Sequence, residues 1–377
     1  MISLQEFLNL FETSPADNQT LELFIETSIV KVQQRTYKLQ DYMERKSISK
    51  ETIKLILMNI KNRKKYLTGF YNMSLRITEK NKHIHNKIKP MPSDNMNNNK
   101  GVIYKNKIRN LHMMDILKNT SSGLDNIPTY LSIIEDLYKQ NIIDYKILTP
   151  SSISYIKKGR LGSVFSSFYF RASILNPYLI YSLNETVLKG TKIFSPTLGW
   201  SSYAFGFLES PMVKEYVGTD VISEVCEKTK DICKEYDVLY NIYNSPSEEL
   251  IKNQSFIKKY QGHFDVIFFS PPYYRLELYA SDNQSTTNYK TYEEWLNKYW
   301  KETVKLCSKV IEKKGRMCYI LSDYGSQNKK KYNLIDDMNR ITQKYFYFKS
   351  IQPMYNKNVH STKHREQGEK IIIFENQ

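Results

Sequence analysis

Apolar residues recur at intervals of three and four positions along the first 80 residues of the chain. Leu21, Phe24 and Ile25 form one such stripe, and a second runs through residues 53–60 after Ser49, a residue type that caps helices. This spacing places the apolar side chains on one face of a helix. The amino-terminal part of the chain is therefore predicted to consist of amphipathic helices.

The pattern changes beyond about residue 160, where short apolar runs typical of buried strands alternate with helical stretches. Strands are expected at residues 192–194, 216–220, 238–243, 265–269, 315–321 and 371–374, and helices at 204–208, 223–236, 247–260 and 292–311. Such alternation predicts an α/β fold with a mainly parallel sheet and helices on both faces.

These patterns divide the chain into two regions. Residues 1–150 are predicted to form a helical, basic region, and residues 151–377 an α/β domain. Between residues 89 and 107, asparagine, proline and glycine interrupt the periodicity and little of the segment can be buried. That composition is typical of a loop or linker.

Charge is distributed unevenly along the chain. Lysine and arginine outnumber aspartate and glutamate 55 to 39, which gives a formal net charge of +16, and twenty basic but five acidic residues lie between positions 31 and 110. A local excess of this size favours contacts with nucleic-acid phosphates, while a solvated helix face is the alternative. The candidate nucleic-acid contacts in this region are Lys61, Arg63, Lys64 and Lys65.

Cysteine usage and hydropathy indicate the compartment. The cysteines at positions 226, 233, 307 and 318 form no Cys-x-x-Cys pair, and no histidine lies at a metal-binding spacing from them. A reducing compartment and no structural metal are expected. Because the sequence has neither a transmembrane run of about 18 apolar residues nor a signal-peptide pattern, an intracellular, cytoplasmic protein without a membrane partner is expected.

One turn carries most of the chemical information. A β-prone apolar run that starts at Asp265 ends in Ser270-Pro271-Pro272-Tyr273. The prolines fix φ and remove two main-chain donors, so that carbonyl groups can point into a pocket. The serine hydroxyl adds an acceptor, and the tyrosine ring adds a stacking face. These features suit a heteroaromatic amine lifted out of a nucleic-acid stack. A proline-rich turn with a core tyrosine is the alternative.

Two further turns are expected at the same edge of the sheet, because ligands of parallel sheets bind beyond the carboxyl ends of the strands. The first turn runs from Ser195 and Pro196 to Gly199, and this glycine can let a ligand approach the backbone closely. The second contains Asp220, whose carboxylate can accept hydrogen bonds from two ribose hydroxyls, unless it is an ordinary helix cap. A nucleoside cofactor and a planar acceptor would then meet at one edge.

In this order the three turns resemble the motifs of S-adenosylmethionine-dependent DNA amino-methyltransferases, which methylate N6 of adenine or N4 of cytosine. The resemblance spans roughly residues 160–377, and the Ser-Pro-Pro-Tyr form is similar to a group found often in phages and large DNA viruses. It implies a Rossmann-like methyltransferase fold, S-adenosyl-L-methionine as cofactor and DNA as partner. RNA is a second option for the partner, and a homodimer or a partner subunit is left open.

The resemblance also implies roles for individual residues. The flipped base would stack on Tyr273, and its amino group would donate to the Ser270 hydroxyl and the Pro271 carbonyl, with Pro272 completing the catalytic turn. The cofactor would be held by Ser195, Pro196, Gly199 and Asp220, with Asn244 or Ser245 near its adenine and Phe170 closing the pocket.

Two positions depart from the family pattern. Ser195 stands where the family has an acidic residue, and Ser201 stands where it has a second glycine. A serine supplies no charge toward the methionine ammonium group. A non-catalytic nucleic-acid-binding subunit is therefore an alternative, as is an RNA or tRNA amino-methyltransferase.

Further candidates follow the catalytic turn in the sequence. Gln284 lies in a stretch expected to contact DNA, and Lys363 and Arg365 lie in a loop that either meets phosphates or is solvated. Trp295 and Trp300 are interpreted as core anchors of the helix in which they lie.

Overall fold

The computed structural model describes residues 2–77, 83–84, 88–122, 129–168, 172–279, 284–325, 331–355 and 368–377. The chain forms two compact units. The amino-terminal unit comprises Met1–Ile77, Asn110–Ala172 and Glu277–Tyr279, and the sheet unit comprises Thr78–Arg109, Ser173–Leu276 and Ala280–Gln377. The predicted division at about residue 150 stays a prediction.

The sheet unit is built on seven strands in the order β13-β14-β10-β8-β5-β6-β7. Their bounds are β5 Lys192–Ser195, β6 Glu215–Asp220, β7 Leu239–Asn244, β8 Phe264–Phe269, β10 Ile311–Leu321, β13 Tyr347–Pro353 and β14 Lys370–Glu375. β5, β6, β7, β8 and β10 are parallel, whereas β14 runs antiparallel to both β10 and β13. The order reverses between β5 and β8, so the switch point of the sheet lies between these two strands.

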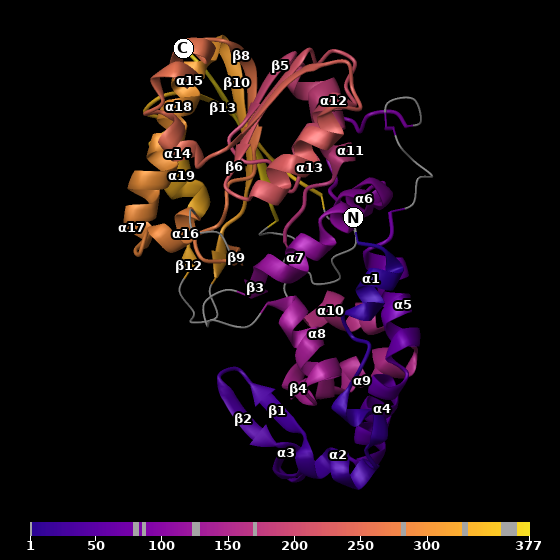
Figure 1. The fold of residues 1–377 in the computed structure, drawn as a ribbon. Helices are drawn as coiled ribbons and strands as arrows, with labels where there is room; N and C mark the ends of the chain where they lie inside the picture. Colours follow the sequence, from indigo (N-terminus) through magenta and orange to yellow (C-terminus); the bar gives the residue numbers. More distant parts are fainter. Residues whose placement is uncertain are drawn as a thin grey trace. The chain divides into compact units, whose positions relative to one another are not determined.

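Helices cover both faces of this sheet. Figure 1 shows α14 (Ser247–Leu250), α15 (Gln254–Tyr260), α18 (Lys301–Val310) and α19 (Leu334–Thr342) on one face, and α11 (Pro177–Leu183), α12 (Ser202–Leu208) and α13 (Ser223–Cys233) on the other. The α/β fold predicted from the sequence, with its mainly parallel sheet of the Rossmann-like methyltransferase type, is confirmed by this strand order and layering. The remaining elements of the unit are α6 (Val102–Leu111), η3 (Asn184–Leu188), α16 (Ser285–Asn288), α17 (Tyr292–Trp295), η4 (Leu296–Trp300) and the hairpin of β11 (Tyr324–Gly325) and β12 (Lys331–Tyr332).

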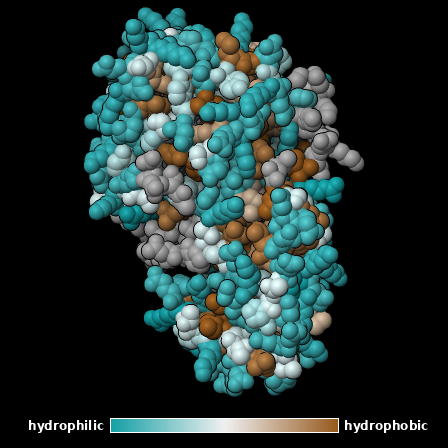
Figure 2. Space-filling model, in the orientation of Figure 1, coloured by the Kyte–Doolittle hydropathy of each residue, from teal (hydrophilic) through white to brown (hydrophobic). Residues whose placement is uncertain are grey.

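The core of the sheet unit lies where the sequence predicted it. Residues 266–269 of β8 are at most 1% exposed, and Trp295 and Trp300 are fully buried, which confirms that both tryptophans are core anchors. The indole of Trp300 donates to the carbonyl of Met338 at 3.0 Å. On the face drawn in Figure 2, hydrophilic side chains predominate over hydrophobic ones.

The segment predicted as a loop at residues 89–107 is partly helical and well packed. Met91 and Met96 are at most 1% exposed, and α6 begins at Val102. The side-chain amide of Asn176 donates to the main-chain carbonyl of Lys100 at 2.7 Å. The hydroxyl of Tyr178 donates to the main-chain carbonyl of Lys89 at 2.6 Å. The expectation that little of this segment is buried was wrong, because α11 supplies partners that a local pattern does not show.

Asp265 stands at the end of β8 opposite the Ser270 turn and has a structural role. Its carboxylate accepts the main-chain N–H groups of Thr191 at 2.8 Å and Lys192 at 2.9 Å, and the Thr191 hydroxyl at 2.6 Å. These bonds fasten the start of β5 to β8. Asp265 therefore aligns the two central strands and takes no part in the chemistry of the turn.

The amino-terminal unit is mainly helical, as predicted. Its helices are α1 (Leu4–Asn9), η1 (Pro15–Asn18), α2 (Leu21–Thr27), α3 (Leu39–Lys46), α4 (Lys50–Lys61), α5 (Arg63–Ser74), α7 (Met113–Asn119), α8 (Tyr130–Lys139), η2 (Tyr145–Leu148), α9 (Pro150–Lys157) and α10 (Leu161–Phe168). It also contains a sheet that the helical pattern did not predict, with β1 (Ile29–Val32) between β2 (Arg35–Lys38) and β4 (Ile142–Asp144). A short antiparallel pair joins β3 (Thr120–Ser122) to β9 (Glu277–Tyr279). No helix in the described parts of the chain is long and apolar enough to cross a membrane.

Candidate active site at the switch point of the sheet

The turn after β5 has an unusual backbone. Gly199, Trp200 and Ser201 have consecutive positive φ values of 52°, 58° and 66°. Non-glycine residues adopt this region only when their surroundings hold them there. Trp200 is 4% exposed, and the Ser201 hydroxyl is 2.7 Å from that of Thr229 on α13. Packing therefore fixes the turn although a serine replaces the second glycine.

Gly199 is required by a neighbouring ring. A Cβ atom at this position would lie 2.2 Å from Cζ of Tyr203 in α12. The sequence predicted that Gly199 allows close approach of a ligand, whereas the structure shows that one side of it admits the buried Tyr203 side chain.

Asp220 connects the turn after β5 to the end of β6. Its Oδ2 atom accepts the N–H of Leu198 at 3.0 Å, and its Oδ1 atom accepts that of Ile222 at 3.1 Å. Burial raises the pKa of Asp220 above its usual range, and main-chain N–H groups offset part of this rise. The main-chain N–H of Val221 is a third donor to this carboxylate, so one of its about four lone-pair sites is left for a donor such as a ribose hydroxyl.

The residues at the end of β7 lie beside Asp220. Asn244 pairs with Asp220 in the strand register, and its side-chain amide donates to the Asp220 carbonyl at 3.0 Å. The N–H of Ser245 donates to the same carbonyl at 3.0 Å. The three residues are therefore brought together as predicted from the sequence, with Asn244 exposed and Ser245 half-buried.

Ser195 and Pro196 end β5 and are both buried. Neither the Ser195 hydroxyl nor the Tyr216 hydroxyl on β6 has a well-aligned hydrogen-bond partner among the described residues. Burial raises the pKa of Tyr216, and the nearby Ser195 hydroxyl lowers it. The position that the family fills with an acid thus holds a neutral hydroxyl facing a second one.

The Ser270 turn follows β8 on the other side of the switch point. The Ser270 hydroxyl donates to the carbonyl of Ile320 on β10 at 3.0 Å. Pro271 is buried and Pro272 half-buried. The Tyr273 hydroxyl accepts the N–H of Ser322 at 2.8 Å and is 3.0 Å from the Ser322 hydroxyl. The end of β10 and the residue that follows it therefore fix the side chains of Ser270 and Tyr273.

Tyr203 is a residue that the sequence reasoning missed. Its hydroxyl accepts the N–H of Ser270 at 3.1 Å, and its ring contacts that of Phe268 edge-on at a centroid distance of 5.2 Å. The Thr197 hydroxyl lies 3.5 Å from the Ser270 carbonyl. Both residues belong to the β5–α12 segment, so this segment holds the main chain of the Ser270 turn. A tyrosine four residues after a turn glycine is the only signal in the sequence, and it equally fits a core residue.

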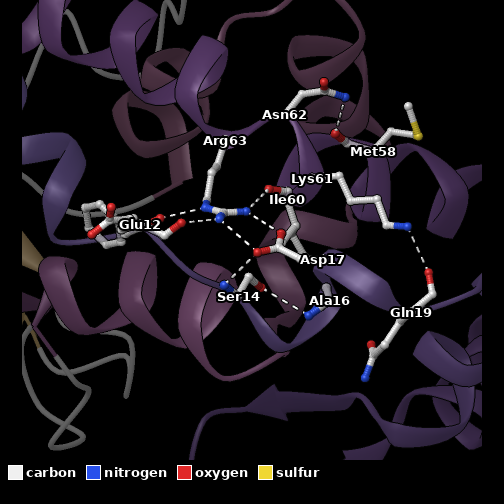
Figure 3. A network of polar contacts seen from close by, with 11 residues as sticks. Glu12, Ser14, Ala16, Asp17, Gln19, Met58, Ile60, Lys61, Asn62 and Arg63 are labelled. Carbon is white, nitrogen blue, oxygen red and sulfur yellow. Dashed lines mark hydrogen bonds and ion pairs between the residues drawn. The ribbon is translucent and has the colours of Figure 1, made fainter.

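Several predicted nucleic-acid contacts have structural roles instead. Arg63 is 14% exposed at its side chain and pairs with Asp17, and it also donates to the carbonyls of Phe11, Glu12 and Ile60 (Figure 3). Gln284 is 3% exposed and caps α16. Because their polar groups are engaged or buried, neither prediction fits the structure.

The remaining predicted contacts are exposed or lie outside the described residues. Lys61, Lys64 and Lys65 are exposed, and the ammonium group of Lys61 donates to the carbonyl of Gln19 at 2.9 Å (Figure 3). Phe170, Lys363 and Arg365 are not among the residues that the structure describes. The interpretation of these six residues stays a prediction.

Comparisons with known proteins give distant structural similarities. No family model and no curated protein sequence matches the chain. TrmN from Thermus thermophilus is 12% identical with a TM-score of 0.35, and the match covers 54% of this chain and 49% of that one. N-methyltransferase NodS from Bradyrhizobium japonicum, in complex with S-adenosyl-L-homocysteine, is 10% identical with a TM-score of 0.33 over 52% of this chain and 83% of that one. A putative methyltransferase from Streptococcus mutans is 10% identical with a TM-score of 0.36 over 55% and 50%. This chain thus spans about half the length of TrmN, and the fold assignment rests on the strand order alone.

Proposed function

We propose that this chain is an S-adenosylmethionine-dependent methyltransferase that modifies the exocyclic amino group of a base flipped out of DNA, at N6 of adenine or N4 of cytosine. One observation carries the proposal: the turn after β5 and the Ser270 turn flank the switch point and are joined by the hydrogen bond from Ser270 to Tyr203. Ligands of open parallel sheets bind at this place. A nucleoside cofactor and a planar amine would therefore meet there.

The residues at the ends of β5, β6 and β7 fit the cofactor. Asp220 has a lone-pair site beyond its three main-chain bonds, Asn244 presents an exposed amide beside it, and Ser195 offers a buried hydroxyl. These groups would hold the ribose, the adenine and the amino-acid end of the cofactor, respectively. S-adenosylmethionine, when bound, supplies an electrophilic methyl group on its sulfonium sulfur.

The Ser270 turn would prepare the acceptor nitrogen. Because the Ser270 hydroxyl donates its own proton to Ile320, its lone pairs are left to accept an N–H of the target amine. A second N–H would bind the Pro271 carbonyl, and the two bonds would draw the nitrogen lone pair out of ring conjugation. Tyr273, whose hydroxyl is fixed at Ser322, would stack on the base. Positioning would then supply most of the acceleration.

The test is methyl transfer from radiolabelled S-adenosylmethionine to DNA lacking modified bases and, in parallel, to RNA. We expect label in DNA, and digestion to nucleosides would identify N6-methyladenine or N4-methylcytosine. The double variant Ser270→Ala, Tyr273→Ala should lose transfer. Label only in RNA would support an RNA amino-methyltransferase instead, and full transfer by the double variant would contradict the catalytic assignment.

A specific observation favours a second candidate, a nucleic-acid-binding subunit without cofactor affinity. Ser195 is fully buried against neutral groups and supplies no charge to a methionine ammonium. Calorimetry with S-adenosylmethionine separates the two candidates. Saturable heat, with or without DNA, supports the enzyme, and its absence under both conditions supports the subunit.

A further inference from the structure

The hairpin of β1 and β2 forms the outer part of the small sheet in the amino-terminal unit. β2 is the outermost strand of that sheet, and Arg35, Thr36 and Lys38 on it are exposed. The two strands are joined through residues 33–34, with φ at Gln33 of 56°. Figure 1 shows the hairpin projecting from the helices of its own unit. Because residues 29–31 of β1 also pair with β4, the accessible part of the ribbon is the turn between β1 and β2 and the outer edge of β2.

This ribbon and the adjoining α3 carry a concentrated positive charge. Six basic and two acidic residues, Asp41 and Glu44, lie between positions 28 and 50. Lys31 pairs with Asp136 at 3.4 Å, whereas Lys38 and Lys46 are exposed. The local balance favours binding of a polyanion.

Two arginines of this surface converge on one side chain. The guanidinium carbon of Arg45 on α3 lies 5.6 Å from the ring centroid of Tyr37 on β2. Arg35 and, to a smaller extent, Arg45 lower the pKa of Tyr37. Guanidinium groups match the geometry of phosphate oxygens, and a pair of them suits a nucleic-acid backbone.

We propose that the β1–β2 hairpin docks in the major groove of duplex DNA, with Arg35 and Arg45 on backbone phosphates and the Gln33-Gln34 turn toward the base edges. The B-form major groove, about 12 Å wide, admits a two-stranded ribbon, whereas the major groove of A-form RNA is deep and narrow. Glutamine amides match the adenine edge in that groove. This inference rests on the proposed function, because it names how the proposed DNA substrate is recognised.

The test is binding of a fluorescently labelled, mixed-sequence DNA duplex to the full chain without cofactor, followed by anisotropy over a range of salt concentrations. The variant Arg35→Gln, Arg45→Gln should raise Kd at least about tenfold, and its plot of log K against log salt should be shallower by about two, one for each lost phosphate contact. The matched control is Lys309→Gln, Lys313→Gln, which removes the same charge from exposed positions of the sheet unit. The control should keep the wild-type slope.

Two further measurements test the groove and the fold. Methylation of guanine N7, which projects into the major groove, should interfere with wild-type binding but not with the residual binding of the arginine variant. The variant Arg35→Lys, Arg45→Lys keeps the charge and should bind within about threefold of wild type, which shows that loss in the glutamine variant is not misfolding.

Other outcomes would overturn the docking. Equal binding of duplex RNA, unchanged affinity of the glutamine variant or absence of N7 interference would each contradict it. No step of this binding assay uses S-adenosylmethionine, so it is independent of the methyl-transfer assay. Docking of the hairpin can be refuted while methyl transfer to DNA is observed. Conversely, absence of methyl transfer would not contradict DNA binding by the hairpin.

Discussion

The main-chain N–H of Ser270 donates a hydrogen bond to the hydroxyl of Tyr203 at 3.1 Å. Because Pro271 and Pro272 have no N–H group, this is the one main-chain donor that the first three residues of the turn possess. The ring of the same tyrosine occupies the space beside Gly199. Tyr203 therefore connects the Ser270 turn to the turn after β5 through a single side chain.

Tyr203→Phe tests this connection. The variant keeps the ring beside Gly199 but removes the acceptor for Ser270, so the Ser270 turn should lose its fixed position. We expect the rate of methyl transfer in a single turnover to fall about tenfold to a hundredfold, because small misplacements of reacting groups are costly. The Kd for S-adenosylhomocysteine should change less than threefold, since the cofactor residues are retained. Amide exchange at Ser270 should accelerate, which is a readout independent of activity.

Tyr319→Phe is the matched control. It removes the hydroxyl of another buried tyrosine of the sheet unit, one that binds the side chain of Asn339 on α19 instead of the main chain of a turn. This control should leave transfer and the exchange rate of the Ser270 amide unchanged. Equal loss of activity in both variants would show that Tyr203 contributes only to stability.

Asp220→Asn tests the cofactor assignment. The amide has one oxygen and cannot accept the N–H groups of both Leu198 and Ile222 together with ribose hydroxyls. Affinity for S-adenosylmethionine should fall about tenfold to a hundredfold, in line with the loss of hydrogen bonds to a charged group. Calorimetry measures this change. The exposed neighbour Glu224, replaced by glutamine, serves as the control, and equal affinity of the Asp220 variant would refute the assignment.

Sequence pattern predicted the sheet unit well for a physical reason. Strands buried on both faces, such as β8, read as continuous apolar runs, and parallel crossovers alternate them with helices. The edge strand β13 was missed because Lys349 and Ser350 interrupt its apolar residues, so that it lacks the continuous run that a central strand shows. β4 was missed because it pairs with β1 from a distant part of the chain, and the β1–β2 hairpin was missed because its Gln33-Gln34 turn lacks the asparagine or glycine typical of two-residue hairpin loops.

The candidate site was predictable only where strand ends carry distinctive side chains. Asp220 and Ser270 follow apolar strands, so their common edge could be inferred from the sequence. The residues that hold Ser270 are Tyr203 and Ile320, which come from other segments and carry no local signature. The prediction that Arg63 contacts nucleic acid does not fit the structure, because a run of basic residues does not reveal that Asp17 forms an ion pair with one of them.

Glu248→Gln tests a buried carboxyl group of α14. Burial raises the pKa of Glu248 from 4.5 to about 7. Between these values the unfolded chain ionises while the folded chain keeps its proton, so wild-type stability should fall as the pH rises from 4.5 to 7. The full difference in stability across this pH range is about 3.5 kcal/mol, at about 1.4 kcal/mol for each step of one in pH. The variant should lose this pH dependence.

Urea denaturation at pH 5 and pH 8 measures the effect. Tryptophan fluorescence is the suitable signal, because all three tryptophans, Trp200, Trp295 and Trp300, lie in the sheet unit. Glu249→Gln removes the same charge from the exposed neighbour and should behave like wild type. If the Glu248 variant and wild type lose equal stability between the two pH values, the buried carboxyl is not the cause.

Arg63→Ala should destabilise the amino-terminal unit by about 2–4 kcal/mol, because it leaves Asp17 without its ion-pair partner and removes the arginine donors from the carbonyls of Phe11 and Glu12. Arg63 lowers the pKa of Asp17, so this contribution is present above the usual value of 3.8 and is lost as the pH falls through the lowered one. The stability difference between wild type and variant should therefore shrink in acid. Far-UV circular dichroism follows this helical unit, and Lys64→Ala at the next, exposed position should change its stability by less than about 0.5 kcal/mol. If both variants change stability by a similarly small amount, Arg63 has no structural role and is again a candidate for phosphate contact.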